Sequence, residues 1–244
     1  MARRRVKRTS RDIIQCATVM FLEQGYTATS TKQIADELDI ALGNLNYHFP
    51  TKEHLLAELV DMLCNFQWKM IEEEANDGLS SIMAICLELT AMAAICDTNA
   101  AAKDFYLSTY SSPMCLEIIR KNDTARAKEV FAQYCPDWTD EQFAEAEVLV
   151  SGIEYATLMT VGDPVSLETR IAGALNGILQ IYNLPEETRR GKIRRVLAMD
   201  YRAIAERMLA ELKQFVIDTN EQALEDLYKA KGLQKPISPK EETL

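Results

Sequence analysis

The chain has 244 residues, 48% of them hydrophobic, which is enough to bury a substantial core as one large domain or two small ones. Nine Gly and seven Pro are too few for an architecture of many short strands and tight turns. The formal net charge of -10 excludes nucleic acid as a partner for most of the surface, because phosphate binding requires cations.

The positive charge is concentrated at the N-terminus. Residues 1–11 contain six Arg or Lys and no acid, and residues 1–8 are predicted to be a flexible basic arm. Residues 1–55 carry eight basic and six acidic side chains, whereas residues 56–244 carry 19 basic and 31 acidic ones. This asymmetry suits a protein that meets DNA with one end and keeps the rest away.

Residues 9–52 contain three short helical patterns. Thr9 or Ser10 can cap the first, which Gly25 ends, and Thr29 or Ser30 can cap the second. The apolar residues that recur at helical spacing are expected to pack together: Ile13, Ala17, Met20, Phe21, Ile34, Leu38, Leu45 and Phe49. The second and third patterns, joined by a tight turn, indicate a helix-turn-helix, which holds one helix ready to enter a major groove.

The run IADELDIALGNLNYHFPTKEHLL at 34–56 resembles the signature of the TetR family of bacterial transcriptional regulators. That signature reads roughly I-A, two residues, hydrophobic-Gly-hydrophobic, Gly-x-Leu-Tyr, an aromatic, His-Phe and then Lys-x-x-Leu-Leu. The resemblance implies an all-α fold: a helix-turn-helix DNA-binding head at 9–52 joined to a larger helical body at 53–231 that binds an effector and dimerises. A tail at 232–244 is expected to be disordered.

The sequence departs from the family pattern at three positions. Asp39 replaces the turn glycine, but Asp tolerates a left-handed backbone. Ala41 replaces the usual capping serine, a loss that costs roughly 0.5–2 kcal/mol. Asn46 replaces a tyrosine, which removes a phosphate contact that the resemblance implies. These departures motivate an alternative, an interaction or co-regulator protein that keeps the fold and has lost specific operator binding.

Candidate DNA contacts are the side chains of the third helix that packing does not need. The amide of Asn44 matches adenine, and Leu42 offers an apolar tip to a thymine methyl. The resemblance implies further contacts, mostly to phosphates, although His48 could equally be a packing residue. The predicted set is Thr31, Lys32, Leu42, Gly43, Asn44, Asn46, Tyr47, His48 and Lys52.

The body begins with a long helix from Lys52 to about Glu74, which belongs to both head and body and can therefore tilt the head. A nearly apolar helix follows at 79–97, in which Glu88 stands alone against the trend. Further helices are expected at 101–112, 114–134, 139–160 and 166–183, then one after Pro185 and one after Asp200. The helix at 114–134 is expected to keep its cations outside: Arg120, Lys121, Arg126 and Lys128.

Met, Cys and aromatic residues are concentrated in the body, where they can line an adaptable apolar cavity or form ordinary core. Tyrosine hydroxyls there could orient the polar end of a small apolar or amphipathic effector. The predicted pocket residues are Phe66, Met83, Cys86, Met92, Phe105, Tyr106, Tyr110, Met114, Phe131, Tyr134 and Tyr155.

Small residues at 152, 156, 172, 173 and 177 indicate close helix approach, because each Gly in a helix costs roughly 1 kcal/mol relative to Ala. In the family, a helix pair at this location forms a four-helix bundle with its symmetry mate. The predicted homodimer interface is therefore Gly152, Ala156, Ala172, Gly173 and Gly177.

Other functional classes have little support. Two histidines, no nucleophile motif and no Gly-rich phosphate loop argue against an enzyme, and six cysteines without a C-x-x-C pair argue against a metal site or a disulfide. The longest apolar stretch, 82–96, is too short for a bilayer. We therefore predict a cytoplasmic, dimeric transcriptional regulator without cofactor, metal or membrane partner, most often a repressor, that binds a double-stranded palindromic operator and is released by its effector.

Overall fold

The computed structural model describes residues 10–76, 80–160 and 164–219, with the backbone alone for 67–76, and these ranges contain helices and no strand. The predicted all-helical class is confirmed. The expected arm at 1–8, the tail at 232–244 and the part of the body beyond Thr219 lie outside the described residues.

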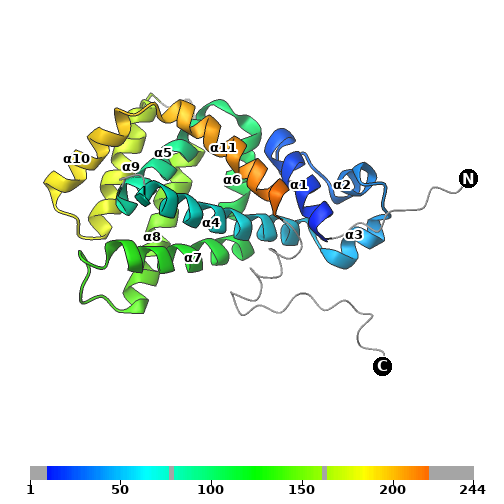
Figure 1. The fold of residues 1–244 in the computed structure, drawn as a ribbon, viewed down its shortest axis with the longest axis horizontal. Helices are drawn as coiled ribbons and strands as arrows, with labels where there is room; N and C mark the ends of the chain where they lie inside the picture. Colours follow the sequence, from blue (N-terminus) through cyan, green and yellow to red (C-terminus); the bar gives the residue numbers. More distant parts are fainter. Residues whose placement is uncertain (1–9, 77–79, 161–163, 220–244) are drawn as a thin grey trace, which may run out of the picture.

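A small unit of three helices occupies one end of the long axis, and a larger bundle occupies the other (Figure 1). The small unit, called the head below, consists of α1 (Ser10–Gln24), α2 (Thr31–Glu37) and α3 (Leu42–His48). The body consists of α4 (Lys52–Asn76), α5 (Ser81–Thr98), α6 (Ala100–Ser111), α7 (Pro113–Phe131), α8 (Asp140–Met159), α9 (Leu167–Ile181), α10 (Glu186–Leu197) and α11 (Tyr201–Asp218).

Local sequence signals define the two helices of the helix-turn-helix. Ser30 caps α2 through a reciprocal capping box with Gln33, as one of the two sequence alternatives predicted. Asp39 takes up the left-handed conformation at φ 53°, so the turn forms without glycine. Ala41 occupies the N-cap of α3 and makes no side-chain hydrogen bond there. At the start of α3 the backbone N–H of Asn44 donates instead to the carbonyl oxygen of Ala41 at 2.8 Å.

Helix α5 is the centre of the body. It packs against α4 and against α6 through α11, and it is buried almost all the way round. Its span Ser81–Thr98 is long and apolar enough to cross a membrane, but 72% of that window is buried inside the protein. The apolar character of α5 is thus used for the core of the body.

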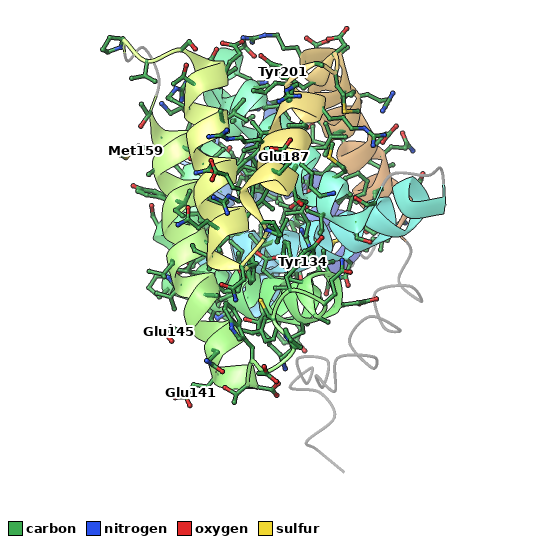
Figure 2. The ribbon with its side chains drawn as sticks, turned by 90° about the vertical axis from the view of Figure 1, so that its left-hand side faces the viewer. Tyr134, Glu141, Glu145, Met159, Glu187 and Tyr201 are labelled. Carbon is green, nitrogen blue, oxygen red and sulfur yellow. The ribbon has the colours of Figure 1, made fainter. Side chains whose placement is uncertain are left out.

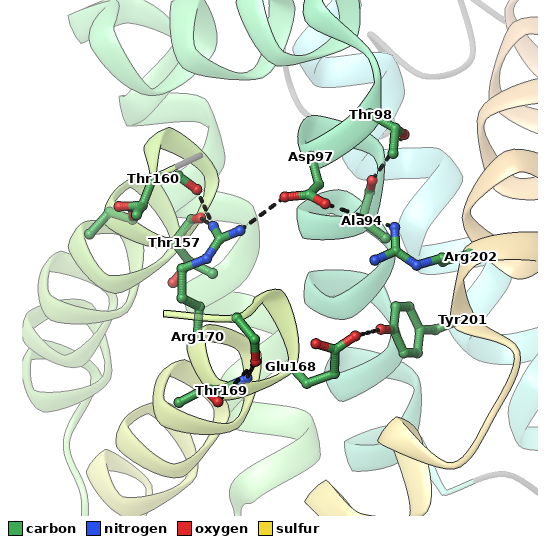
Figure 3. Close-up of polar contacts among 12 residues, drawn as sticks. Ala94, Asp97, Thr98, Thr157, Thr160, Glu168, Thr169, Arg170, Tyr201 and Arg202 are labelled. Atoms are coloured by element: carbon green, nitrogen blue, oxygen red, sulfur yellow. Dashed lines mark hydrogen bonds and ion pairs between the residues drawn. The ribbon is translucent and has the colours of Figure 1, made fainter. Parts of the chain in front are cut away.

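Arg170 of α9 joins the C-terminal ends of α5 and α8 (Figure 3). Its guanidinium donates to the carbonyls of Thr157 and Thr160, which the end of α8 leaves without helical partners, and to Asp97 at 3.0 Å. Arg202 of α11 reaches the same carboxylate at 3.9 Å. These contacts hold α8 and α9 side by side at the outer surface of the body.

Candidate functional site

The outer face of α3 carries most of the predicted DNA contacts. Leu42 and Tyr47 are 40% and 43% exposed, and Asn44 and Asn46 are also exposed, as is the backbone at Gly43. On the opposite face, Leu45 and Phe49 are buried and hold the helix against α1 and α2. The head therefore presents a surface of amides and apolar tips that its own packing does not need.

The other predicted contacts flank this surface. Lys32 is exposed and forms an ion pair with Asp36 at 2.6 Å. The Nδ1 atom of His48 lies 2.9 Å from the hydroxyl of Ser10, and its ring meets the Tyr47 ring edge to face. Thr31 is half-buried at the start of α2.

Lys52 has a role within the head that the sequence did not indicate. Its ammonium donates to the carbonyls of Tyr26 and Thr29 at 3.0 and 2.9 Å and lies 4.0 Å from the centre of the Tyr26 ring. Burial lowers the pKa of Lys52, and the carboxylate of Asp104 opposes that shift. Lys52 thus fastens the loop between α1 and α2 to the start of α4, while its contact with DNA stays a prediction.

The same loop is held from the other side by α6. The carboxylate of Asp104 accepts hydrogen bonds from the backbone N–H and the hydroxyl of Thr27. Gly25 has φ 93°, and a Cβ built there would lie 2.8 Å from the Asp104 carboxylate, so this close approach requires glycine. Next to it, the hydroxyl of Ser112 donates to Glu53 at 2.5 Å. The head is therefore anchored on α4 and α6.

Helix α11 supplies a third attachment. Arg11 donates to the carbonyl oxygens of Thr219 and Ile217 at 2.8 and 3.1 Å, and Gln15 donates to Ile217 at 2.5 Å. These carbonyls lie at the C-terminal end of α11 as far as the structure describes it.

A cavity of about 50 Å³ lies inside the body, walled by α4 to α9. Four predicted pocket residues line it: Met92, Tyr106, Tyr110 and Phe131. A smaller cavity of about 20 Å³ adjoins it, lined by Phe66 together with Met92 and Tyr106. The first cavity has room for a few water molecules and is far below the roughly 300–1,000 Å³ of a typical ligand pocket.

The remaining predicted pocket residues lie outside these two cavities. Met83, Cys86 and Phe105 are fully buried core residues, and burial raises the pKa of the Cys86 thiol to about 12. Met114, Tyr134 and Tyr155 are partly buried. For these six side chains the structure shows packing, and a role in ligand binding stays a prediction.

The wall of the larger cavity is unexpectedly rich in ionisable groups. It contains the guanidinium of Arg126 and four carboxyl groups, those of Glu88, Asp123, Glu147 and Glu154. Arg126 is 6% exposed and donates to Glu88 at 2.6 Å, while Asp123 lies 3.7 Å away. Arg126 was expected on the outside of its helix, and that expectation was wrong, because the lone Glu88 of α5 draws the guanidinium into the core.

Two tyrosine hydroxyls hold the other carboxyl groups. Tyr182 donates to Glu147, and Tyr110 donates to Glu154 at 2.9 Å. Burial, together with the neighbouring Asp123, raises the pKa of Glu147 to about 8 and the pKa of Glu154 well above its usual range. Burial also raises the pKa of Asp123 to about 6, with Glu88 adding to the shift and Arg126 opposing it.

These residues were absent from the predicted pocket, although the sequence held a signal for some of them. Glu88 lies in the middle of the apolar helix α5, whose other charged residue, Asp97, is next to its last residue. Glu147 and Glu154 are seven residues apart, which places them on one face of α8 with the buried Val150. A carboxyl group on an otherwise apolar helical face indicates a buried polar site.

The predicted dimer residues lie on the outer side of α8 and α9. Gly152, Ala156 and Gly173 are exposed, and a Cβ built at either glycine would meet nothing within 4 Å. Gly177 differs, since a Cβ there would contact Ile153 at 3.5 Å. Packing within one chain therefore does not explain the glycines at 152 and 173.

Exposed apolar side chains continue the same face of α8: Val148, Leu149 and Met159 are 49%, 56% and 48% exposed. Figure 2 shows Met159, Glu145 and Glu141 projecting from the outer edge of α8, away from the body. The face is apolar along most of α8 and acidic at its N-terminal end.

No group of three or more His, Cys, Asp or Glu side chains is arranged to hold a metal ion in the described part of the chain. Five of the six cysteines are buried, and Cys16 is half-buried.

Residues 13–59 match the family model described as bacterial regulatory proteins, tetR family. The HTH-type transcriptional regulator QacR of Staphylococcus aureus is 40% identical over 50 residues, which are 20% of this chain and 27% of QacR. The HTH-type transcriptional repressor KstR2 of Mycobacterium tuberculosis is 39% identical over 49 residues, 20% of this chain and 24% of KstR2. The chain thus aligns with about a quarter of the length of these curated relatives, and the matches concern the head.

Among solved structures, a crystal structure of a gamma-butyrolactone receptor (ArpA-like protein) matches 82% of this chain and 95% of its own, with 18% identity and a TM-score of 0.41. The structure of the ketosteroid transcriptional regulator KstR2 of Mycobacterium tuberculosis matches 73% of this chain and 95% of its own, with 18% identity and a TM-score of 0.38.

Proposed function

We propose that this protein is a dimeric transcriptional regulator of the TetR family and acts as a repressor, because residues 13–59 match the family model of these bacterial regulatory proteins. In the cytoplasm, the two heads of the dimer bind a palindromic operator in double-stranded DNA. The dimer is released from the operator when a small effector binds inside the body. The observation that carries the proposal is the face of α3 on which Leu42, Asn44, Asn46 and Tyr47 are exposed, while Leu45 on the opposite face is buried.

The route from cavity to head supports release by an effector. Helix α6 contributes Tyr106, Thr109 and Tyr110 to the cavity wall, and its Asp104, two residues from Tyr106, holds the head loop at Thr27. Helix α4 likewise contributes Val60 and Leu63 to the wall and begins at the loop clamp formed by Lys52. A ligand larger than the present cavity must move these helices, so binding shifts the heads by as much as its affinity differs between the two arrangements.

The exposed face of α8 and α9 supports a homodimer. An unpaired stripe with open space at Gly152 and Gly173 allows the same helices of a second copy to approach closely. In such a dimer the two heads must span half-sites about one helical turn, roughly 34 Å, apart or a small adjustment of that.

The test is a titration of the full chain with DNA taken from beside its own gene. Specific binding is expected, with an affinity that falls steeply with salt because each phosphate contact releases counterions. Binding that shows neither sequence preference nor salt dependence would refute the proposal.

The second candidate, an interaction protein without operator binding, is favoured by Ala41, whose side chain leaves the N-terminus of α3 without a cap. In that case the native chain should bind no operator, and the double change Ala41→Ser with Asn46→Tyr should create DNA binding. Tight binding by the native chain would dispose of this candidate.

A further inference from the structure

The cavity between α4 and α9 has more acidic groups than its single cation can neutralise. Arg126 can balance Glu88 and Asp123 only in part, since one guanidinium carries one charge. Glu147 and Glu154 have tyrosine hydroxyls as hydrogen-bond partners, and in the described part of the chain neither forms an ion pair with a Lys or Arg. The charged groups that act on Glu147 are Asp123, Arg126 and Glu88, and those that act on Glu154 are Asp123, Glu147 and Glu88.

The hydrogen-bonding groups of Arg126 in the cavity wall are not all paired within the described part of the chain. Its side chain is 7% exposed, and its Nε and Nη1 atoms have no hydrogen-bond partner, although both are buried and Nη1 lies 3.7 Å from Asp123. A buried guanidinium normally satisfies its N–H groups, since an unpaired one is costly. Two donors that line a cavity therefore call for an acceptor atom supplied from outside the chain.

The rest of the wall is apolar and aromatic. Met92, Tyr106, Phe131 and Ile178 surround the polar groups, so the site suits a molecule with a compact hydrocarbon part. A bare metal ion does not fit, because the described carboxyl groups do not come together as a set of three ligands.

We infer that this cavity, widened by displacement of its wall helices, takes a small organic cation, an amine or quaternary ammonium with an oxygen acceptor near its charge, whose positive group faces Glu147 and Glu154 and whose oxygen meets Arg126. The identification of this ligand class with the effector rests on the proposed function. Burial raises the pKa of Glu147 to about 8, so a cation that pairs with its carboxylate favours the loss of its proton.

Choline is a suitable probe because 3,3-dimethylbutan-1-ol is its neutral isostere, with carbon in place of the quaternary nitrogen, and 3,3-dimethylbutanoate is an anion of similar size with a carboxylate in place of the alcohol group. Calorimetry on the full chain without DNA should show binding of choline, weaker binding of the alcohol and none of the anion. Choline carries a permanent charge, so any pH dependence comes from the protein. The affinity for choline should rise about tenfold from pH 6 to pH 8, because a larger fraction of the Asp123 and Glu147 carboxyl groups is ionised at the higher pH.

Glu147→Gln and Glu154→Gln keep a hydrogen-bond acceptor for the tyrosines and remove the charge that the cation requires. Each should weaken choline at least several-fold and flatten the pH dependence, while Glu117→Gln, an exposed site on α7, should leave both unchanged. Both cavity variants should fold, since an amide resembles the protonated acid, and thermal unfolding checks this.

Equal affinity for choline and its neutral isostere, preference for the anion, or unchanged choline binding in both Gln variants would overturn the inference. If choline binds but leaves the affinity for the operator unaltered, the inference of a cation site is supported, and the proposed release by an effector is contradicted. The two ideas therefore fail separately.

Discussion

The carboxylate of Asp104 in α6 accepts two hydrogen bonds from Thr27 in the head, from its backbone N–H at 2.7 Å and from its hydroxyl at 2.6 Å. Thr27 and Asp104 are 77 residues apart in the chain, and they connect the loop before α2 to a helix that lines the cavity. Any displacement of α6 is therefore transmitted to the base of the helix-turn-helix.

This connection predicts an energetic coupling between the two residues. Thr27→Val removes the hydroxyl donor, and Asp104→Asn weakens the acceptor, so each should lower the free energy of unfolding by about 0.5–1.5 kcal/mol. Urea unfolding of the two single variants and the double variant measures the coupling. The double variant should lose less than the sum of the two, and strictly additive losses would show that the contact contributes nothing.

Among the side chains of α3, Asn44 should contribute most directly to recognition of the operator's base sequence. Asn44→Ala should cost about 1–3 kcal/mol of specific operator binding and leave binding to unrelated DNA unchanged, because the exposed amide offers both a donor and an acceptor to a base. Competition titrations with operator and random DNA measure the difference. Gln133→Ala, which removes an exposed amide from the body, is the control, and an equal loss in both variants would contradict the role of Asn44.

Ala41→Ser should stabilise the head. A serine at this N-cap can accept a hydrogen bond from the start of α3, as Ser30 does for α2, and such a cap contributes about 0.5–2 kcal/mol. Ala41→Ser should raise the midpoint of thermal unfolding, whereas Ala125→Ser on the exposed side of α7 should not raise it. An unchanged midpoint for Ala41→Ser would mean that water already satisfies those N–H groups.

The glycines on α8 and α9 distinguish the dimer from ordinary packing. Gly152→Ala and Gly173→Ala have open space within the chain, so each should stabilise the isolated helix by roughly 1 kcal/mol yet weaken dimerisation by about tenfold through crowding of the partner. Sedimentation equilibrium measures the dissociation constant. Gly191→Ala in α10 has the same open space and should change helix stability only. Similar dissociation constants for all three variants would argue for a different interface.

The buried carboxyl groups make stability depend on pH. Glu147 has a folded pKa near 8 against an ordinary value of 4.5, so the unfolded state loses its proton first and stability should fall as pH rises from about 4.5 to about 8. The slope approaches roughly 1.4 kcal/mol per pH unit for each such group. At constant ionic strength, the unfolding midpoint of Glu147→Gln should depend less steeply on pH than that of the native chain. The midpoint of Glu117→Gln should depend on pH as steeply as that of the native chain. A native midpoint that is flat over this range would contradict the assignment.

The sequence by itself determined the all-helical class, the helix-turn-helix and the approximate limits of the helices. These depend on local features, the 3.6-residue spacing of apolar side chains and the capping residues such as Ser30, which act within a few residues of each other. It also indicated that Leu42, Asn44, Asn46 and Tyr47 are exposed, because Leu45 and Phe49 occupy the buried face.

Only the tertiary structure decided the composition of the cavity and the fate of individual charges. The neighbours of Arg126 in the chain predicted that it is a surface cation, and the family resemblance implied that Lys52 contacts a phosphate. Their actual partners, Glu88 and the carbonyls of Tyr26 and Thr29, lie 23 to 38 residues away. Periodicity identifies the face of a helix, but which helix meets that face is set by the packing of the whole body.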